Sequence, residues 1–388
     1  MRLDPSRRTG IVCALGTAQT VAWASSYYLP AVLATPTARD LGFSPVWIFA
    51  AFSAAMVVSA LVGPWAGARI DRLGGRGVLI ASNLVFATGL ILIGVSTHLV
   101  GVFAGWFVMG IGMGIGLYDS AFASLAAIYG RDARTPITGI TLIAGFASTI
   151  GWPLSAVMEA EFGWRFACFG WAGLHLLLAL PLNLLLPSGT QATPKPMGGE
   201  AISTPDAPSL RSLMLLGFVF AVTWFTSTAM AAHLPRLLEA AGATSVAAVA
   251  AGALIGPAQV GARIMEFALL RRLHPLVSAR LATLTHPVGA GVLMLIGGPA
   301  AAMFTLLHGA GNGILTIAKG TLPLALFGPA GYGLRQGIIS APARVLQAFA
   351  PLIFGFALEH YGANAIWLTF GLGVLAFLAL LLLKAKPD

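Results

Sequence analysis

Four ionisable side chains interrupt long apolar stretches of this 388-residue chain: Asp119, Arg263, Glu266 and Arg344. A charged group is costly in an apolar environment, so one that is retained there usually binds or moves something. A guanidinium holds a carboxylate through two parallel hydrogen bonds, which makes arginine a suitable ligand for an anion. We therefore expect Arg263 and Arg344 to form the positive pole of a site for an organic anion.

The two carboxylates suggest a different chemistry. Glu266 follows Arg263 by three residues on the same helix face. Like Asp119, it is a candidate for proton coupling or gating, and the alternative is a local ion pair with Arg263 that only packs the structure. Asp119 is the only charged residue in GIGMGIGLYDSAFASLAAIYG, residues 110–130. It could close a gate by meeting a basic group, with Arg344 as the first candidate. It could instead carry a proton, or serve only as a structural partner.

Polar side chains near these charges could complete a binding pocket. Aromatic residues with a polar tip offer a substrate both an apolar surface and a hydrogen bond. Each candidate could equally be a packing residue. The candidates for substrate binding are Tyr27, Tyr28, Tyr118, His233 and Gln259.

The spacing of His, Cys, Asp and Glu matches no metal site, and neither a phosphate-binding loop nor a nucleophile elbow is present. We expect no metal, no cofactor and no catalytic residue. An intramembrane enzyme or receptor is therefore disfavoured.

The elements that position these residues follow from composition. The chain is 57% hydrophobic and 9% charged, with a mean hydropathy of +0.87, which excludes an ordinary soluble domain. About 20 apolar residues cross a bilayer as a helix. This length predicts an all-α membrane protein with twelve spans, near 10–35, 46–70, 77–96, 99–128, 137–160, 164–187, 210–236, 246–270, 277–297, 299–319, 336–359 and 363–384.

The basic residues predict how the spans are oriented. Seventeen of the 22 Lys and Arg residues, Lys319 among them, fall at the termini or in the loops on one side, and three fall on the other. Loops rich in Lys and Arg face the cytoplasm. We therefore expect a multi-pass protein of the inner membrane with both termini in the cytoplasm. The net charge of +9 indicates this topology, and we expect no nucleic-acid partner.

A polar segment rich in Pro, Gly, Ser and Thr divides the chain in the middle. It predicts a cytoplasmic linker over 188–208 between two pseudo-symmetric six-helix halves, 1–187 and 209–388. The halves repeat in sequence, because residues 138–164 align with residues 336–362 at an offset of 198. Internal duplication in a helical membrane protein is typical of a transporter with its site between the halves.

The loop after the second span carries a recognisable motif. GPWAGARIDRLGGRG, residues 63–77, resembles the signature between spans 2 and 3 of the major facilitator superfamily. Gly75 departs from the signature, which usually has a basic residue there. The resemblance implies that a glycine lets helices approach closely, and that the charged residues latch the cytoplasmic side. The matching residues are Gly67, Asp71, Arg72, Gly74 and Arg76.

The first span, AWASSYYLPAVLATPTARDLGFS, resembles the monocarboxylate and oxalate–formate branch of this superfamily. Relatives in that branch carry an arginine on the eighth span, often with an acid four residues earlier. Here Arg263 is present, but Gln259 replaces the acid, so a proton-linked mechanism does not carry over.

These features together predict a secondary transporter that moves a small organic anion, most simply a carboxylate, by alternating access. We expect a monomer, and protons are a candidate coupling ion. The alternative is a proton-coupled efflux pump for drugs or metabolites.

Overall fold

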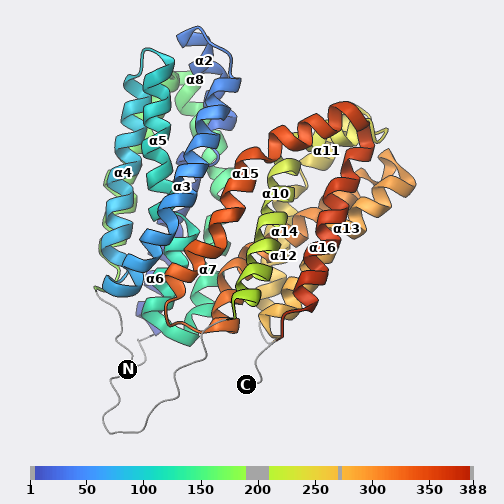
Figure 1. Ribbon diagram of the computed structural model, residues 1–388. Helices are drawn as coiled ribbons and strands as arrows, with labels where there is room; N and C mark the ends of the chain where they lie inside the picture. Colours follow the sequence, from blue (N-terminus) through green and yellow to red (C-terminus); the bar gives the residue numbers. More distant parts are fainter. Residues whose placement is uncertain (1–4, 189–208, 270–272, 385–388) are drawn as a thin grey trace.

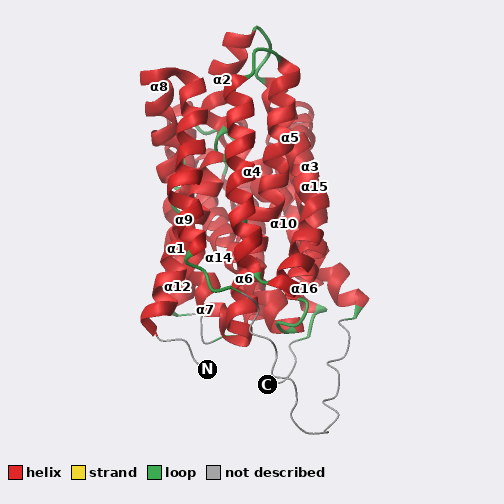
Figure 2. Ribbon diagram, turned by 90° about the vertical axis from the view of Figure 1, so that its left-hand side faces the viewer, coloured by secondary structure: helices red, strands yellow, loops and turns green. Residues whose placement is uncertain are grey.

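The computed structural model describes residues 5–188, 209–269 and 273–384, and these ranges fold almost entirely into helices (Figures 1 and 2). Helix α1 begins and helix α16 ends at the same end of the bundle, which we call the terminal end; the opposite end is the distal end. The predicted linker, 188–208, lies outside the described residues except for Ser188.

Helices of the first half run from Pro5 to Leu184. They are α1 (Pro5–Ser25), α2 (Pro30–Leu41), α3 (Val46–Leu73), α4 (Gly75–Val95), α5 (Leu99–Gly116), α6 (Tyr118–Tyr129), η1 (Gly130–Ala133), α7 (Arg134–Ala144), α8 (Ala147–Leu174), η2 (His175–Ala179) and α9 (Leu180–Leu184). The second half contains α10 (Leu210–Ala240), α11 (Ser245–Gly252), α12 (Ile255–Ala268), α13 (Pro275–Ile296), η4 (Gly298–Ala300), α14 (Ala301–Phe327), α15 (Tyr332–Tyr361), η5 (Gly362–Ala365) and α16 (Ile366–Leu381).

Eight helical segments of the described chain are long and apolar enough to cross a membrane. Two of them cross more than once: the 86-residue segment Leu99–Leu184 reverses twice, and the 50-residue segment Tyr332–Leu381 reverses once. One reversal lies inside α8 at Gly163, whose φ of 83° suits glycine. With the crossing formed by α1 and α2, these segments give the predicted twelve-helix arrangement.

Several crossings are broken, and the breaks lie near the candidate residues. The first crossing is interrupted between Ser25 and Pro30, which places Tyr27 and Tyr28 in the break. The fourth is interrupted at Leu117, directly before Tyr118. Breaks of this kind are tolerated where a span lines a cavity or packs against other helices.

The structure corrects the predicted boundaries of the tenth and eleventh spans. Helix α14 continues to Phe327, so Lys319 lies inside the helix with only 8% of its surface exposed. The prediction that this span ends at residue 319, with Lys319 in a loop, is therefore wrong. The next crossing begins at Tyr332 rather than at residue 336. A lysine in an apolar stretch resembles the end of a span, and its partner on another helix is not visible in the local sequence.

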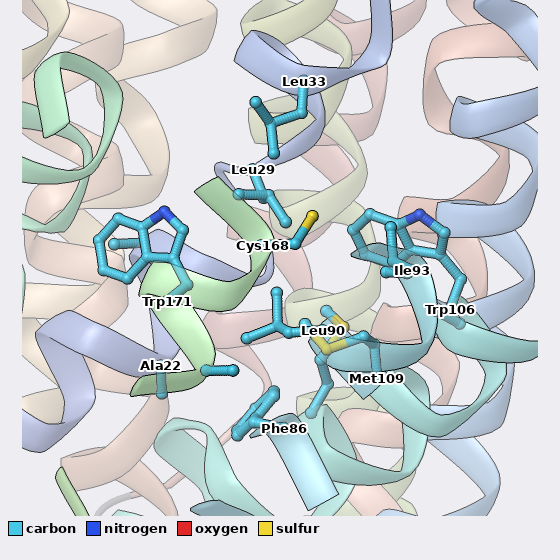
Figure 3. Packing of buried hydrophobic residues seen from close by; sticks show 14 of the residues in the cluster. Ala22, Leu29, Leu33, Phe86, Leu90, Ile93, Trp106, Met109, Cys168 and Trp171 are labelled. Atoms are coloured by element: carbon cyan, nitrogen blue, oxygen red, sulfur yellow. The ribbon is translucent and has the colours of Figure 1, made fainter. Parts of the chain in front are cut away.

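Each half has its own apolar core. In the first half, Phe86, Trp106 and Trp171 pack among Leu, Ile and Met side chains from neighbouring helices (Figure 3). A separate cluster around Phe304 and Phe354 fills the second half. Large apolar side chains also cover the outside, as Leu177 and Leu295 do at 83% and 87% exposure. Such a surface suits lipid, so the protein is a multi-pass membrane protein.

Candidate functional site

The two halves meet along α3 and α15, which lie side by side (Figure 1). At the terminal end, Asp71 on α3 accepts two backbone hydrogen bonds from the start of α15. The Gly333 N–H bonds to Oδ1 and the Leu334 N–H to Oδ2, both at 2.8 Å. The first N–H groups of a helix have no partner within the helix and attract negative charge. The Asp71 carboxylate therefore ties the two halves together at this end.

The other residues of the predicted latch motif surround this contact. Gly67 lies against the Gly333 backbone so closely that a Cβ atom on it would overlap the Gly333 carbonyl. Gly74, with φ 82°, links α3 to α4. Arg76 donates a hydrogen bond to Ser188, and Arg72 is exposed.

A charge cluster crosses the interface deeper in the bundle; its members are Asp119, Lys319, Gln336, Ser340 and Arg344. Asp119 on α6 belongs to the first half, and the other four belong to α14 and α15 of the second half. The Lys319 ammonium lies 3.0 Å from Asp119 Oδ1, and Arg344 Nη2 lies 2.6 Å from Oδ2. Both cations therefore share one carboxylate.

Neutral donors complete the shell around this carboxylate. Gln336 Nε2 and Ser340 Oγ each donate to Asp119 Oδ1 at 3.1 Å. Asp119 is 6% exposed, so its charge is compensated by these side chains rather than by water. Arg344 also donates to Ser59 on α3, and the Lys319 ammonium lies 5.1 Å from the centroid of the Trp224 ring. The cluster joins α3, α6, α10, α14 and α15.

The cluster carries one more positive charge than negative. Asp119 contributes one negative charge, whereas Lys319 and Arg344 each contribute a positive charge when protonated. No other carboxylate in the described residues lies within ion-pairing distance of these two cations. The contact between Asp119 and Arg344 is the one that the gating hypothesis expects. Whether Asp119 gates, carries a proton or only pairs stays a prediction.

Arg263 on α12 is buried in a different environment. It is 5% exposed, and its Nη1 donates a hydrogen bond of 3.4 Å to the Thr141 carbonyl on α7 of the other half. Its Nε has no partner, and no carboxylate in the described residues pairs with it. Arg263 is within electrostatic range of the Tyr28 and Tyr118 hydroxyls. Because no carboxylate in the described residues pairs with Arg263, its positive charge is not neutralised there.

In the described residues Glu266 pairs with Arg134 and not with its neighbour Arg263, so the alternative of a local Arg263–Glu266 ion pair is wrong, whereas a role of Glu266 in proton coupling or gating stays a prediction. Glu266 Oε1 lies 3.3 Å from Arg134 Nη2, on α7 of the first half. Arg134 also donates to the Leu273 carbonyl at 2.8 Å. Arg134 meets Glu266 near the terminal ends of α7 and α12, so the carboxylate serves a contact between the halves.

Three predicted tyrosines lie on the first-half side of the interface. The Tyr27 hydroxyl meets Thr228 Oγ1 on α10 of the other half at 3.2 Å, and Gln347 Nε2 donates to the same threonine. Tyr27 and Tyr28 are in edge contact with each other. Tyr118 stacks on Phe122. The structure thus brings Tyr28 and Tyr118 near Arg263 and joins Tyr27 to the second half.

His233 and Gln259 are placed apart from this group. His233 on α10 bonds through Nε2 to the Pro351 carbonyl on α15, within the second half, while its Nδ1 has no partner. Gln259 on α12 is half-buried, and its backbone lies against Gly313 on α14. In the described residues, no hydrogen bond joins either side chain to the charge cluster. Their predicted role in substrate binding has no support from these contacts.

At the distal end, the ion pairs of the described residues stay within one half. Arg165 and Trp164 on α8 both donate to Asp40 on α2, and these hydrogen bonds lower the pKa of the Asp40 carboxyl. Arg236 and Glu359 approach to 4.0 Å within the second half. Figure 1 shows the two halves leaning apart toward this end. The contacts between halves therefore close the terminal end.

Sequence reasoning missed several residues of this site. Lys319 is the last residue of its predicted span and counts with the cations of the loops, whereas Gln336 and Ser340 lack a charge that would have drawn notice. Arg134 falls in a predicted loop. The signal that could have found Lys319 is the apolar segment GTLPLALF directly after it, which continues the span for two more turns.

Comparisons with known proteins agree with this architecture. Residues 15–307 match the family model of the Major Facilitator Superfamily. The solved structure of the human organic anion transporter MFSD10 superimposes with a TM-score of 0.75 and 20% identity, covering 97% of this chain and 100% of that one. The fucose:proton symporter FucP of Escherichia coli also gives a TM-score of 0.75, with 14% identity over 97% of this chain and 98% of that one.

A curated relative matches part of the chain. The proton myo-inositol cotransporter hmit-1.2 of Caenorhabditis elegans is 30% identical over 141 residues, which is 33% of this chain and 22% of that protein. The match thus spans less than a quarter of the relative's length. The family match covers most of the chain, so the protein is a transporter and not an enzyme. The chain belongs to the Major Facilitator Superfamily.

Proposed function

We propose that this protein is a secondary transporter for a small organic anion, with Arg263 as its principal anion ligand. The observation that carries the proposal is the buried guanidinium of Arg263, whose charge no carboxylate of the described chain neutralises. A buried charge without a counter-ion costs at least about 3 kcal/mol on insertion scales. A bound carboxylate would remove that cost and gain two charge-assisted hydrogen bonds.

Further features support an anionic substrate with an apolar body. Tyr28 and Tyr118 lie near Arg263 and offer aromatic surfaces with hydroxyl groups. In this proposal Arg344 keeps a place in the anion site, although its charge is held by Asp119 in the present conformation. The sequence of the first span and Arg263 on the eighth span are also the basis for the finer assignment to the monocarboxylate and oxalate–formate branch.

The orientation of the bundle in the membrane is part of the same proposal. The basic loops favour the terminal end as the cytoplasmic side of the inner membrane. The halves, 1–187 and 209–388, would then rock about the linker 188–208 so that the site faces each side in turn. Contacts between halves at the terminal end support a conformation that is closed toward the cytoplasm.

Two alternatives concern the substrate. The names of FucP and of the inositol cotransporter suggest a sugar or polyol. A neutral polyol would leave the charge of Arg263 uncompensated. An efflux pump for cationic drugs is also less compatible with the surplus positive charge at the interface, since like charges repel.

The test is uptake of radiolabelled lactate, benzoate and myo-inositol into proteoliposomes, with binding measured by thermal shift. We expect a carboxylate to be transported, and Arg263→Ala to weaken its binding at least about tenfold, since hydrogen bonds to charged groups contribute about 1.5–3 kcal/mol. Arg263→Lys should restore binding only in part, because lysine lacks the planar fork.

The matched control is Arg236→Ala, which removes an exposed arginine at the distal end. It should leave carboxylate binding unchanged. Transport of myo-inositol alone, or unchanged carboxylate affinity in Arg263→Ala, would contradict the proposal.

A further inference from the structure

We propose that Lys319 is the residue that binds and releases the coupling proton of this transporter. The inference rests on the proposed function in one respect, because it assumes that the halves alternate between closure at the terminal end and closure at the distal end. It differs from the sequence-based hypothesis, which placed the proton on Asp119.

The first argument is the division of the cluster between the halves. Asp119 lies on α6 in the first half, whereas Lys319 and Arg344 lie on α14 and α15 in the second half. Opening of the terminal end therefore parts the carboxylate from both cations at once. Lys319 and Arg344 remain in the same half, where both had contacted one carboxylate. Two neighbouring positive charges without a counter-ion repel each other.

The second argument is which of the three groups can give up its charge. Arginine keeps its proton in proteins, whereas a buried lysine changes its protonation state readily. Asp119 accepts hydrogen bonds from two cations and two neutral donors in the closed arrangement, all of which favour its ionised form. Protonating Asp119 there would leave the two cations without an anion. Lys319 is the one member free to respond.

The third argument is the shell around the ammonium. Asp119 and Arg344 are the ionisable groups that act on Lys319 from the neighbouring helices. Trp224 on α10 presents its ring to the ammonium, and a ring face attracts a cation. Asp119 and Trp224 thus favour protonated Lys319 while the terminal end is closed, and Asp119 leaves when it opens.

The proton transfer balances simply. When the terminal end opens, an N–H bond of the Lys319 ammonium breaks, the electron pair stays on nitrogen and the proton passes to water on that side. Once that end has closed and the opposite side is open, the amine takes up a proton from water on the opposite side. Each cycle would move one proton with the substrate.

The experiment compares Lys319→Arg and Lys319→Gln with the wild type in proteoliposomes. The arginine variant keeps a positive charge that cannot be released, and the glutamine variant has none to release. We expect both to lose substrate accumulation driven by a proton gradient while retaining exchange at equal concentrations on both sides. Lys384→Arg, at an exposed position near the end of the chain, is the matched control and should accumulate substrate normally.

The outcome also separates this inference from the proposed function. If the wild type accumulates myo-inositol and no carboxylate, the proposed substrate is wrong, yet the comparison with Lys319→Arg still tests the proton site. Gradient-driven accumulation by Lys319→Arg at the wild-type level would overturn the inference.

A second measurement needs no substrate. Trp224 lies beside the ammonium, so its fluorescence should follow the protonation of Lys319 in protein held in lipid nanodiscs. The contribution of Trp224 is the fluorescence of the wild type minus the fluorescence of Trp224→Phe. We expect that difference to change with pH in the wild type and to be flat in the Lys319→Arg background. A flat difference in the wild type, or the same pH dependence in both backgrounds, would overturn the inference.

Discussion

At the scale of single residues, the charge balance at the interface between the halves depends on one carboxylate that two cations share. Asp119 compensates two buried cations of the other half, and Gln336 and Ser340 add neutral hydrogen bonds. Such a site is sensitive, because removing one partner of a buried ion pair leaves an uncompensated charge and costs about 3–5 kcal/mol. We therefore expect the cluster to influence both the stability of the closed state and transport.

The stability of the protein should follow the charge balance of this cluster. Asp119→Asn removes the only negative charge and leaves two cations, so we expect a loss of about 3–5 kcal/mol of stability. Adding Lys319→Gln to Asp119→Asn lowers the remaining charge by one, and the double variant should recover part of the loss. Denaturation in detergent micelles measures both. A double variant no more stable than Asp119→Asn would show that charge does not govern this site.

Transport by Asp119→Asn should distinguish a gate from a proton carrier. If Asp119 closes the gate and Lys319 carries the proton, Asp119→Asn slows substrate exchange and gradient-driven accumulation alike. Lys319→Arg, in contrast, stops accumulation only. Both fluxes are measured in the same proteoliposomes. Loss of accumulation with normal exchange in Asp119→Asn would show that Asp119, rather than Lys319, carries the proton.

At the scale of helices, the closed end depends on how closely α3 approaches α15. Gly67 and Gly333 bring the two backbones together, and Gly337 lies against Pro64 one turn further along. Any side chain at Gly67 would push against the Gly333 carbonyl, which belongs to a backbone that cannot rotate away. Glycine is needed at this position because of the other half rather than because of its own helix.

The two glycines of α3 offer a matched pair of variants. Gly67→Ala should separate α3 from α15 at the terminal end at a cost of about 1–3 kcal/mol, as for an overpacked core. Gly63→Ala lies one turn earlier, where an added Cβ would meet nothing, and should be neutral or slightly stabilising. Thermal unfolding compares the two. Equal effects would mean that the contact between helices does not limit closure.

The helices were predictable to different degrees. Twelve crossings and the two halves follow from apolar length and repetition, which can be recognised along the chain itself. The partners of charged residues were not predictable in the same way. Glu266 lies three residues from Arg263 yet pairs with Arg134 across the interface, because the folded bundle brings a second cation to it. The prediction that Lys319 lies in a loop is wrong for the same reason, because its partner Asp119 lies on another helix.

At the scale of the whole molecule, the contacts are arranged asymmetrically between the two ends. Asp71, Arg134 and Asp119 of the first half all bind the second half in the terminal part of the bundle. The ion pairs of Asp40 and Arg236, near the distal end, stay within their own halves. Alternating access requires the terminal contacts to be strong enough to hold one state and weak enough to be released.

The latch formed by Asp71 should therefore set the balance between the two states. Asp71→Asn keeps the shape of the side chain but removes its charge and one acceptor oxygen from the start of α15. A loss of about 1.4 kcal/mol would shift the equilibrium about tenfold toward an open terminal end. We expect a lower transport rate and little change in the affinity of the substrate site, because Asp71 lies apart from Arg263.

Cysteine labelling can report this shift directly. Ile137 is fully buried and lies against Gly320 of the other half, so Ile137→Cys should be labelled only when the terminal end opens. In a background with Cys13→Ser, labelling should rise in Asp71→Asn and stay low in the control Asp132→Asn, an exposed acid near the same end. Native Cys168, buried in the core of the first half, provides an internal standard that should not respond. Unchanged labelling of Ile137→Cys would mean that the charged loop only orients the protein in the membrane and that the cluster around Asp119 holds the terminal end closed.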